Sequence, residues 1–397
     1  MKTKILTTTV LLLSWVSLFT DISSEMLYPV IPIYLASMHY SAAFIGLLEG
    51  VAEFIAGLSK GYFGLWSDKL QKRLIFVRTG YILSAFAKPL MILIPSGWWV
   101  LFTRTLDRFG KGIRTASRDA MLSEEATPET KGRVFGFHRS MDTLGAAIGP
   151  AIALLFLWFY PNQYQWLFIA ALIPGIITLI FLFRLKEKKK TPQFTTFKVN
   201  FFSFLGYIKK SSMSYRLLII GLLLFALFNS SDMFLLLKAK ELGLSDSEVI
   251  GLYIGYNLVY AIFSVPAGML ADKIGLNKVF VLGVMIFAFV YAGFAFASSL
   301  IMLVVLFAVY GFYAASTEGI GKAWISNVVN KSEVAGAIGS YTALQSTAAL
   351  LASVFAGILW TKFGSKTTFL LTAIISLLVV FYFIAIGSKV EYQKKTE

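Results

Sequence analysis

The sequence predicts an all-α membrane protein with twelve transmembrane helices in two pseudo-symmetric six-helix bundles. Three observations support this fold class. Hydrophobic residues make up 57% of the 397 residues and charged residues 14%, which is more apolar surface than a water-soluble fold of this length buries. Apolar stretches of about 20 residues, the length that crosses a bilayer, recur along the chain. One short charged pattern occurs twice, around Asp68 and around Asp272, half a chain apart.

Each expected span is an apolar stretch of at least bilayer length. The first begins close to Met1 and lacks a small-residue cleavage site, so we expect it to be retained rather than removed as a signal peptide. The spans are expected at residues 8–35, 42–63, 74–94, 98–120, 134–160, 165–184, 216–238, 249–270, 278–297, 301–322, 336–361 and 367–387.

Basic residues are concentrated in alternate connections between these spans, and the opposite connections are short. The positive-inside rule therefore places the basic connections and both termini in the cytoplasm. The sequence predicts an integral multi-pass protein of the cell's inner or plasma membrane. The largest basic runs are Lys69–Arg73, Arg184–Lys190 and Lys389–Lys395, and the short connections are 95–97, 161–164 and 298–300.

One long polar segment divides the chain. We expect residues 1–184 to form the N-terminal six-helix bundle, 185–215 a cytoplasmic linker, and 216–397 the C-terminal bundle with a short cytoplasmic tail. The linker's phenylalanines are compatible with a helix lying on the membrane surface and equally with a plain solvated linker. These phenylalanines are Phe197, Phe201, Phe202 and Phe204.

The composition excludes several function classes. The chain has no cysteine, so it has no disulfide framework and no thiolate metal site. The net charge of +15 is located beside the spans and does not indicate nucleic acid. His39 and His138 are the only histidines, and no Gly-x4-Gly-Lys-Ser/Thr phosphate loop occurs, so neither an enzyme nor an ATP-driven pump is predicted. We expect no cofactor and no metal, and a monomer whose partners are a small-molecule substrate, protons and the lipid bilayer.

Three pairs of short patterns recur in the same order in both halves. Ser23-Ser24-Glu25-Met26 recurs as Ser230-Ser231-Asp232-Met233, the loop at Asp68 recurs at Asp272, and Gly132 before the fifth span corresponds to Gly336 before the eleventh. The offsets are 204 to 207 residues. Three ordered matches at nearly one offset indicate an ancient duplication of a six-span half.

The first charged loop reads Gly64-x-x-x-Asp68-Lys69-x-x-Lys72-Arg73. It resembles the signature between spans two and three of the major facilitator superfamily, and the loop Gly268 to Lys273 resembles its copy between spans eight and nine. The loop departs from the pattern at Gln71, where the family has glycine, and at Leu276 in the second copy. The resemblance covers the whole chain and implies a carrier that works by alternating access.

The resemblance also implies specific contacts for the loops. Asp68 should meet the start of the eleventh span near Gly336, where the positive end of a helix stabilises an acid by about 0.3–1 kcal/mol. Lys72 should pair with Asp119 at the end of the fourth span. These contacts would hold the halves together when the carrier is open outward, with Gly64, Gly268 and Asp272 in the same gating role. The alternative is that the loop is only a positive-inside anchor.

Ionisable side chains at bilayer depth are expensive unless they serve transport or neutralise one another. The first span places Asp21 and Glu25 on one face with Tyr28, and the second places Glu49 beside Glu53 in the same way. The segment from Asp21 to Pro32 resembles the first span of proton-driven drug exporters. The proton-coupling candidates are therefore Asp21, Glu25, Glu49, Glu53 and, on the fifth span, Asp142.

The fourth span carries a basic stripe on one helix face, formed by Arg104, Arg108, Lys111, Arg114 and Arg118. Asp107 lies beside it, and the fifth span adds His138 and Arg139, so the N-terminal half is nearly self-neutral. Two interpretations follow. The charges are a structural network, or some acid lacks a permanent partner and carries a proton through the cycle. Arg104 or Arg108 resembles the arginine that drug exporters place in this span, and the choice between them stays open.

The C-terminal half has fewer charges, and its interior is expected to be aromatic. Such a lining suits an amphipathic organic ligand. The polar and aromatic residues are Asp232, Glu318, Lys322, Tyr253, Tyr256, Asn257, Tyr260, Tyr310, Tyr313 and Gln345. The predicted substrate-binding residues of both halves are Tyr28, Arg104, Arg108, Lys111, His138, Asp232, Tyr256, Asn257 and Glu318.

The fifth span contains Gly136, Gly145, Gly149 and Pro150 at a spacing that resembles the antiporter signature of exporter branches, although Ala153-Leu154 stands where two glycines are usual. A generic small-residue packing face would explain the same glycines. The sequence favours proton-coupled export of a small organic molecule. The alternative is an importer or facilitator of an anionic metabolite or carboxylate siderophore, which the cationic fourth span would favour.

Overall fold

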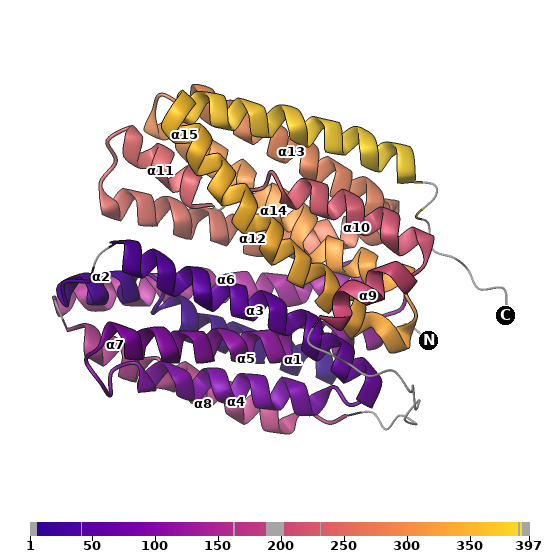
Figure 1. The fold of residues 1–397 in the computed structure, drawn as a ribbon, viewed down its shortest axis with the longest axis horizontal. Coiled ribbons are helices and arrows are strands. Elements are labelled where there is room, and N and C mark those ends of the chain that lie inside the picture. The colour runs from indigo at the N-terminus through magenta and orange to yellow at the C-terminus, as the bar shows by residue number, and fades with distance from the viewer. Residues whose placement is uncertain are drawn as a thin grey trace. The chain divides into compact units, whose positions relative to one another are not determined.

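The computed structural model describes residues 6–40, 42–161, 163–187, 202–230, 232–387 and 390. Every regular element in these ranges is a helix (Figure 1). The chain forms two compact units. In sequence, unit 1 is Met1–Glu125, Met141–Tyr207 and Lys331–Ala343, and unit 2 is Ala126–Ser140, Ile208–Asn330 and Leu344–Glu397.

Unit 1 contains the helices of the first half of the chain and the beginning of the last helix. They are α1 (Thr8–Glu25), α2 (Val30–Ser37), α3 (Ala42–Leu70), α4 (Leu74–Leu90), α5 (Gly97–Glu124), α6 (Lys131–Phe159) from Met141 onward, α7 (Tyr164–Ala170), α8 (Leu172–Arg184), α9 (Ser203–Lys210) up to Tyr207, the 3-10 turn η1 (Lys331–Glu333) and the start of α15 (Val334–Ile386).

Unit 2 contains the helices of the second half and the first residues of α6. They are α10 (Met213–Ala226), α11 (Met233–Glu241), α12 (Asp246–Ile274), α13 (Leu276–Phe296), α14 (Leu300–Val328) and the rest of α15. Gly364, with φ +81°, interrupts α15 between the two expected spans 336–361 and 367–387, so one continuous element covers both.

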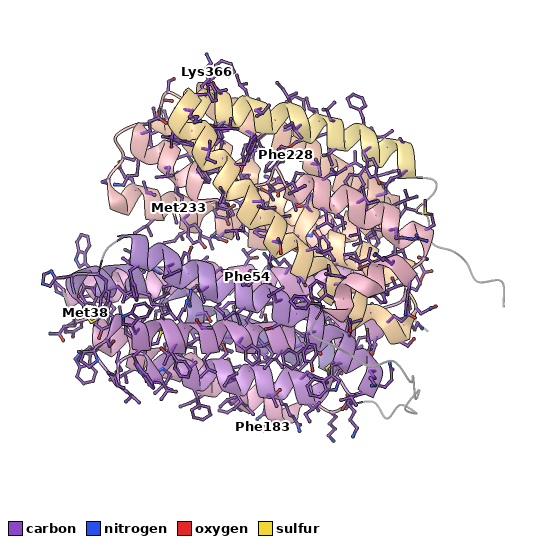
Figure 2. The ribbon with its side chains drawn as sticks, in the orientation of Figure 1. Met38, Phe54, Phe183, Phe228, Met233 and Lys366 are labelled. Atoms are coloured by element: carbon purple, nitrogen blue, oxygen red, sulfur yellow. The ribbon has the colours of Figure 1, made fainter. Side chains whose placement is uncertain are left out.

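The helices follow the expected spans. Seven of them are long and apolar enough to cross a membrane, and α15 among these covers two expected spans. The expected spans outside this set contain charged side chains on α3 and α5, or are short or interrupted, as in α4 and in the pair α10 and α11. Large apolar side chains point away from the units, as Phe183 does at 59% exposure (Figure 2), and this surface is suited to lipid.

The first and seventh spans are both broken, at equivalent places in the repeat. In the first, α1 ends at Glu25 and α2 begins at Val30, directly after Pro29, which cannot donate to the helix. In the seventh, α10 ends at Ala226 and α11 begins at Met233, and the intervening segment carries Asn229 and Asp232. Discontinuous helices at corresponding positions of two repeats are characteristic of transporter binding sites.

Glycines bring α5 into close contact with both of its neighbours in unit 1. A Cβ on Gly80 of α4 would lie 2.5 Å from the carbonyl oxygen of Gly110, and one on Gly112 would clash with Ser59 of α3. Because the backbones approach so closely, α5 packs against α3 and α4 along its length (Figure 1). The basic face of α5 is therefore held among these helices rather than facing lipid.

The described part of the linker includes α9. Phe204 is buried and its ring packs at Gly61 of α3, within unit 1, whereas Phe202 is 61% exposed. Phe204 thus packs on protein rather than inserting into the membrane surface. The other two phenylalanines, Phe197 and Phe201, lie outside the described residues.

Candidate functional site

In unit 1 the basic stripe of α5 meets the acid pair of α3. The guanidinium of Arg104 donates to both carboxylate oxygens of Glu49, at 3.0 and 3.3 Å, and lies 3.5 Å from Asp107. The guanidinium of Arg108 lies 3.1 Å from Glu53. Arg104 is 1% exposed, and a buried ion pair of this kind depends on having both partners present.

Arg114 and Arg118, at the C-terminal end of the basic stripe, also have partners in the protein. Arg114 lies over the ring of Tyr81, 4.3 Å from its centroid. Arg118 lies 3.0 Å from Asp119 and 3.8 Å from Asp142, and donates to the hydroxyl of Ser17 at 3.2 Å. These arginines are therefore bound to groups of the protein.

Lys111 differs from the arginines around it. Its nearest charged neighbours are Arg108, Glu53, Asp21 and Glu25, yet within the described ranges no carboxylate reaches it as an ion pair. Lys111 is thus a half-buried cation whose partner is not fixed.

Asp21 of α1 and Asp142 of α6 face each other within hydrogen-bonding reach. The hydroxyl of Ser17, one turn earlier on α1, donates to Asp142. Because two carboxylates this close repel each other, a proton on one of them would stabilise the pair.

The fifth-span glycines explain this approach. A Cβ on Gly145 would lie 2.6 Å from the carbonyl oxygen of Leu18 and 2.9 Å from Cβ of Asp21. A Cβ on Gly149 would lie 2.7 Å from the amide of Met26, where α1 ends. Glycine at both positions lets α6 lie directly on the stretch of α1 that carries Asp21 and Glu25.

Sequence reasoning missed Lys88 on α4. It is 2% exposed, and Asp107 is its nearest opposite charge. Asp107 also accepts a hydrogen bond from Ser84, one helical turn before Lys88. The balance of embedded charges therefore includes one more cation than the stripe suggests. Lys88 lies well inside the expected third span, whereas Arg78, its other basic residue, lies near the start of the span, and a lysine at such depth is the signal that could have identified it.

In unit 2 the break in the seventh span places Asp232 among tyrosines. Its carboxylate accepts hydrogen bonds from the hydroxyls of Tyr256 at 2.7 Å and Tyr310 at 2.6 Å. Asn229, in the same break, donates to the hydroxyl of Tyr313 at 2.9 Å. Across the described ranges, Asp232 makes no ion pair with a lysine or arginine.

The remaining candidates in unit 2 do not all reach Asp232. Arg139 donates to the hydroxyl of Tyr260 at 2.5 Å and lies 3.7 Å from Glu318, which is half-exposed. Asn257 is buried and donates to the carbonyl oxygen of Tyr253. His138 is buried on α6.

In unit 1, Tyr28 is 36% exposed and lies near the charges of Glu49 and Glu25. Within the described residues, no group of three or more histidine or acidic side chains is arranged to hold a metal ion.

The charged loops contact helix beginnings in both units. In unit 1, Asp68 accepts from the amides of Ala335, at 3.3 Å, and Gly336, which confirms the expected contact with the start of the eleventh span. In unit 2, Asp272 accepts from the amides of Gly132, at 2.8 Å, and Arg133, at 3.1 Å, at the start of α6. Both acids thus cap the positive end of a helix.

Glycines make these contacts possible. A Cβ on Gly64 would overlap the carbonyl oxygen of Ala335, and one on Gly268 would overlap that of Gly132. Burial raises the pKa of Asp68 to about 6, even though the Arg73 guanidinium and the Gly336 amide favour its charged form.

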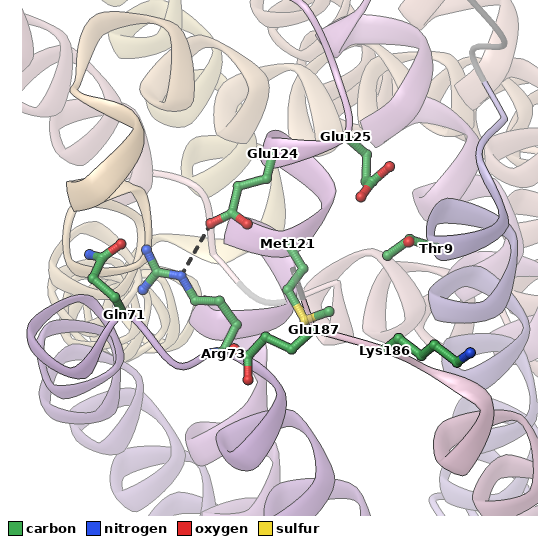
Figure 3. A pocket seen from close by; sticks show the side chains of 8 residues that line it. All are labelled: Thr9, Gln71, Arg73, Met121, Glu124, Glu125, Lys186 and Glu187. Atoms are coloured by element: carbon green, nitrogen blue, oxygen red, sulfur yellow. Dashed lines mark hydrogen bonds and ion pairs between the residues drawn. The ribbon is translucent and has the colours of Figure 1, made fainter. Parts of the chain in front are cut away.

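The basic partner of Asp68 is Arg73, whereas the resemblance implied a pair between Lys72 and Asp119. Arg73 pairs with Asp68 and donates to the carbonyl oxygen of Ser332. It also lies 3.4 Å from Glu124 (Figure 3). Asp119 instead pairs with its neighbour Arg118, and Lys72 contributes its backbone carbonyl to Ser67. The expectation was wrong because Asp119 is paired with Arg118, its neighbour on α5, while Arg73, which follows the turn at Gln71 with φ +50°, pairs with Asp68.

The same region holds the start of the linker. Glu187 accepts from the backbone amides of Arg73 and Leu74 and so caps the beginning of α4. Glu187, Lys186 and Thr9 line a small pocket around Arg73 (Figure 3). The first linker residues are therefore fixed to unit 1.

Comparisons with known proteins agree on one family. The model of the Major Facilitator Superfamily matches residues 13–254 and 217–397. An uncharacterised transporter of this type from Methanocaldococcus jannaschii is 37% identical over 376 residues, which is 93% of this chain and 92% of the relative. A homologue of the multidrug resistance efflux pump PmrA from Lactococcus lactis is 23% identical over 317 residues, 76% of each chain.

Solved structures share the fold. The human organic anion transporter TETRAN has a TM-score of 0.80 at 16% identity and covers 95% of this chain and 99% of its own. The Escherichia coli fucose:proton symporter FucP has a TM-score of 0.76 at 13% identity and covers 95% of this chain and 98% of its own. Identities this low indicate the fold alone.

Proposed function

Because this chain belongs to the Major Facilitator Superfamily, and so is a secondary active transporter rather than an enzyme, we propose that it exports a small organic molecule in exchange for protons. Residues 1–184 and 216–397 would be the two halves that alternate, joined by the 185–215 linker, with both termini in the cytoplasm. The observation that carries the proposal is the carboxyl pair Asp21 and Asp142.

The pair supports proton coupling for two reasons. A proton on one partner would relieve the repulsion between the two carboxylates, and it can leave when the pair separates or becomes hydrated. The pair also lies where Gly145 and Gly149 bring α6 onto α1, next to the break after Glu25. A movement of α6 along α1 would change the distance between the carboxyl groups and thereby link proton binding to conformation.

Lys111 has a defined part in this proposal. Once Asp21 and Asp142 are both ionised, their repulsion needs a counter-charge, and Lys111 is the nearby cation without a fixed partner. Arg104 and Arg108 are held by Glu49 and Glu53 and act as a structural clamp between α5 and α3.

Two further features support export. The multidrug resistance pump homologue is a relative over three quarters of this chain. Four of the arginines of the N-terminal half are bound to carboxylates or aromatic rings, which leaves little fixed positive charge to attract an anion.

The two charged loops have a gating role in this proposal. The pair of Asp68 with Arg73 and the pair of Asp272 with Arg133 would close the cytoplasmic ends of the helices in one state of the cycle.

A second function has one observation in its favour. Lys111 could serve as the anchor of a carboxylate substrate, as an importer or facilitator of anions would require. This alternative predicts that Lys111 binds substrate directly, whereas the leading proposal predicts that Lys111 is a counter-charge for the carboxyl pair and does not bind substrate.

The test uses proteoliposomes with an imposed pH gradient and two fluorescent probes, ethidium as a cation and carboxyfluorescein as an anion. We expect ethidium to move against its gradient in exchange for protons, and Asp142→Asn and Asp21→Asn to abolish the dependence on the pH gradient. Movement of carboxyfluorescein with protons, lost in Lys111→Gln, would replace export by the anion alternative. Gradient-dependent ethidium flux in both aspartate variants would remove the pair from the proton path.

A further inference from the structure

A groove on unit 2 lies next to the Asp232 cluster. It is a cavity of ≈ 330 Å³ between α12 and α14, and its lining is apolar apart from Glu248 at one end and the Tyr256 hydroxyl. This volume is within the range of small-molecule pockets. The residues that define it are Gly251, Gly255, Tyr256, Val304 and Phe307.

Two glycines on α12 create the groove. A Cβ on Gly251 or on Gly255 would meet no atom within 4 Å, so the space beside them is open. Across the groove, Leu300 and Val304 of α14 are 45% and 50% exposed. Exposed aliphatic side chains beside an open glycine face suit a hydrocarbon ligand in the bilayer.

Tyr256 connects this groove to the carboxylate. Its ring lines the groove, and its hydroxyl donates to Asp232 at 2.7 Å. Ring centroids of Tyr253 and Tyr310 lie 5.5 Å from that of Tyr256, so several aromatic faces surround the acid. Aromatic faces attract organic cations, and a carboxylate without a basic partner completes such a site.

Asp232 fits this role because its own contacts leave its charge uncompensated. Two phenol donors stabilise it, but no lysine or arginine of the described residues pairs with it, and Arg139 is engaged with Glu318 and Tyr260. An incoming ammonium group would supply the missing charge while Tyr310 kept its hydrogen bond.

We propose that unit 2 binds a lipophilic organic cation, with its hydrocarbon part in the α12 and α14 groove and its ammonium group at Asp232 beside Tyr256. The groove lies at the beginning of α14, which follows the short connection 298–300. If export is the function, as proposed above, this end faces away from the cytoplasm, and the groove is the route by which the substrate leaves into the outer leaflet.

The test measures binding without any gradient, in lipid nanodiscs, by the shift of the unfolding temperature. The probes are octyltrimethylammonium, tetramethylammonium, which lacks the chain, and octyl sulfate, which carries the opposite charge. We expect octyltrimethylammonium to stabilise the protein. Tetramethylammonium should bind at least about tenfold more weakly, and octyl sulfate should give no shift.

Variants test the carboxylate of Asp232 and the apolar groove separately. Asp232→Asn should remove the preference for the cation over octyl sulfate, and Asp232→Glu should restore part of it. Gly251→Leu with Gly255→Leu should remove the preference for the octyl chain. Gly50→Leu, at an exposed α3 glycine whose Cβ would also meet no atom within 4 Å, is the matched control and should change neither.

Three results would overturn the proposal. The first is equal stabilisation by octyl sulfate and octyltrimethylammonium. The second is an unchanged preference for octyltrimethylammonium over octyl sulfate in Asp232→Asn. The third is an unchanged preference for octyltrimethylammonium over tetramethylammonium in the Gly251→Leu, Gly255→Leu variant. Because no proton gradient is present, these results are independent of the direction and coupling of transport. Loss of coupled flux with intact cation binding would count against the exporter proposal alone.

Discussion

Replacing Gly145 with alanine tests the link between helix packing and the proton position. The new Cβ would lie 2.6 Å from the carbonyl oxygen of Leu18 and 2.9 Å from Cβ of Asp21, whereas ordinary contacts are about 3.5–4.0 Å. Both atoms lie on the helix backbone of α1 or directly on it, so neither can rotate away. The helix α6 must therefore move from α1 by about 1 Å.

A shift of this size has a specific consequence for Asp142. It lies one turn before Gly145 on α6 and faces Asp21 and Ser17 on α1, so a displacement of about 1 Å takes its hydrogen bonds beyond useful length. We expect Gly145→Ala to reduce stability by about 1–3 kcal/mol through overpacking. We expect pH-driven ethidium flux to fall by at least about tenfold, since the shared proton position is lost.

The assay compares flux with and without a pH gradient, together with the unfolding temperature. Gly175→Ala on α8 is the control, because its Cβ would meet only Ala85 Cβ at 3.8 Å and Ser23 Oγ at 4.0 Å, which are ordinary contacts. This control should fold and transport normally. A Gly145→Ala protein with normal unfolding temperature and normal gradient-driven flux would refute the argument that close packing sets the carboxyl pair.

Three other predictions concern separate parts of unit 1. Arg104→Gln leaves the acids around it unpaired and should cost about 3–5 kcal/mol in unfolding free energy; an unchanged unfolding temperature would show that the pair is not needed for stability. Burial raises the pKa of Asp68 from 3.8 to about 6, so the folded protein binds a proton that the unfolded chain does not, and the contribution of Asp68 to the free energy of unfolding should increase as pH falls from 7 to 4, by up to about 3 kcal/mol. The free energy of unfolding, measured in wild type and in Asp68→Asn over this pH range, should differ by this trend; an identical pH dependence in the variant would assign it to another group. Phe204→Ala should raise exchange over 203–210 with little effect on ligand binding, and unchanged protection there would show that the buried ring does not hold α9.

The sequence predicted those features that depend on local pattern. The positions of the spans follow from hydrophobicity and length, and the contact between Asp68 and Gly336 follows from a motif placed at a fixed loop. The repeated pattern that contains Glu25 in the first span and Asp232 in the seventh likewise lies where the helices break, although the breaks themselves were not expected. In the first span Pro29 explains the break, and in the second half the polar segment around Asn229 does so without a proline.

The sequence could not predict which helix faces which. Periodicity showed that Asp21 and Asp142 lie on polar faces, but their pairing depends on the close approach that Gly145 allows. For the same reason the expected pair of Lys72 with Asp119 was wrong and the pair of Arg73 with Asp68 was not expected, since the directions of side chains in a turn depend on backbone angles such as that at Gln71. Lys88 was missed because its partner, Asp107, belongs to a helix that follows later in the sequence.

The duplicated halves have kept one backbone feature and changed the chemistry around it. After α1, the break lies beside the carboxyl pair Asp21 and Asp142, in a setting crowded with ion pairs. After α10, the break holds Asp232, which has phenol donors and no basic partner in the described part of the chain. A proton can neutralise the first site, whereas a bulkier organic cation suits the second, because aromatic rings accommodate a diffuse charge that ion-pair networks exclude. We infer that proton handling and substrate recognition have been divided between the repeats. Asp142→Asn should therefore impair proton-coupled flux and leave the binding of the organic cation unchanged. Asp232→Asn should impair cation binding and leave proton binding at the first site unchanged.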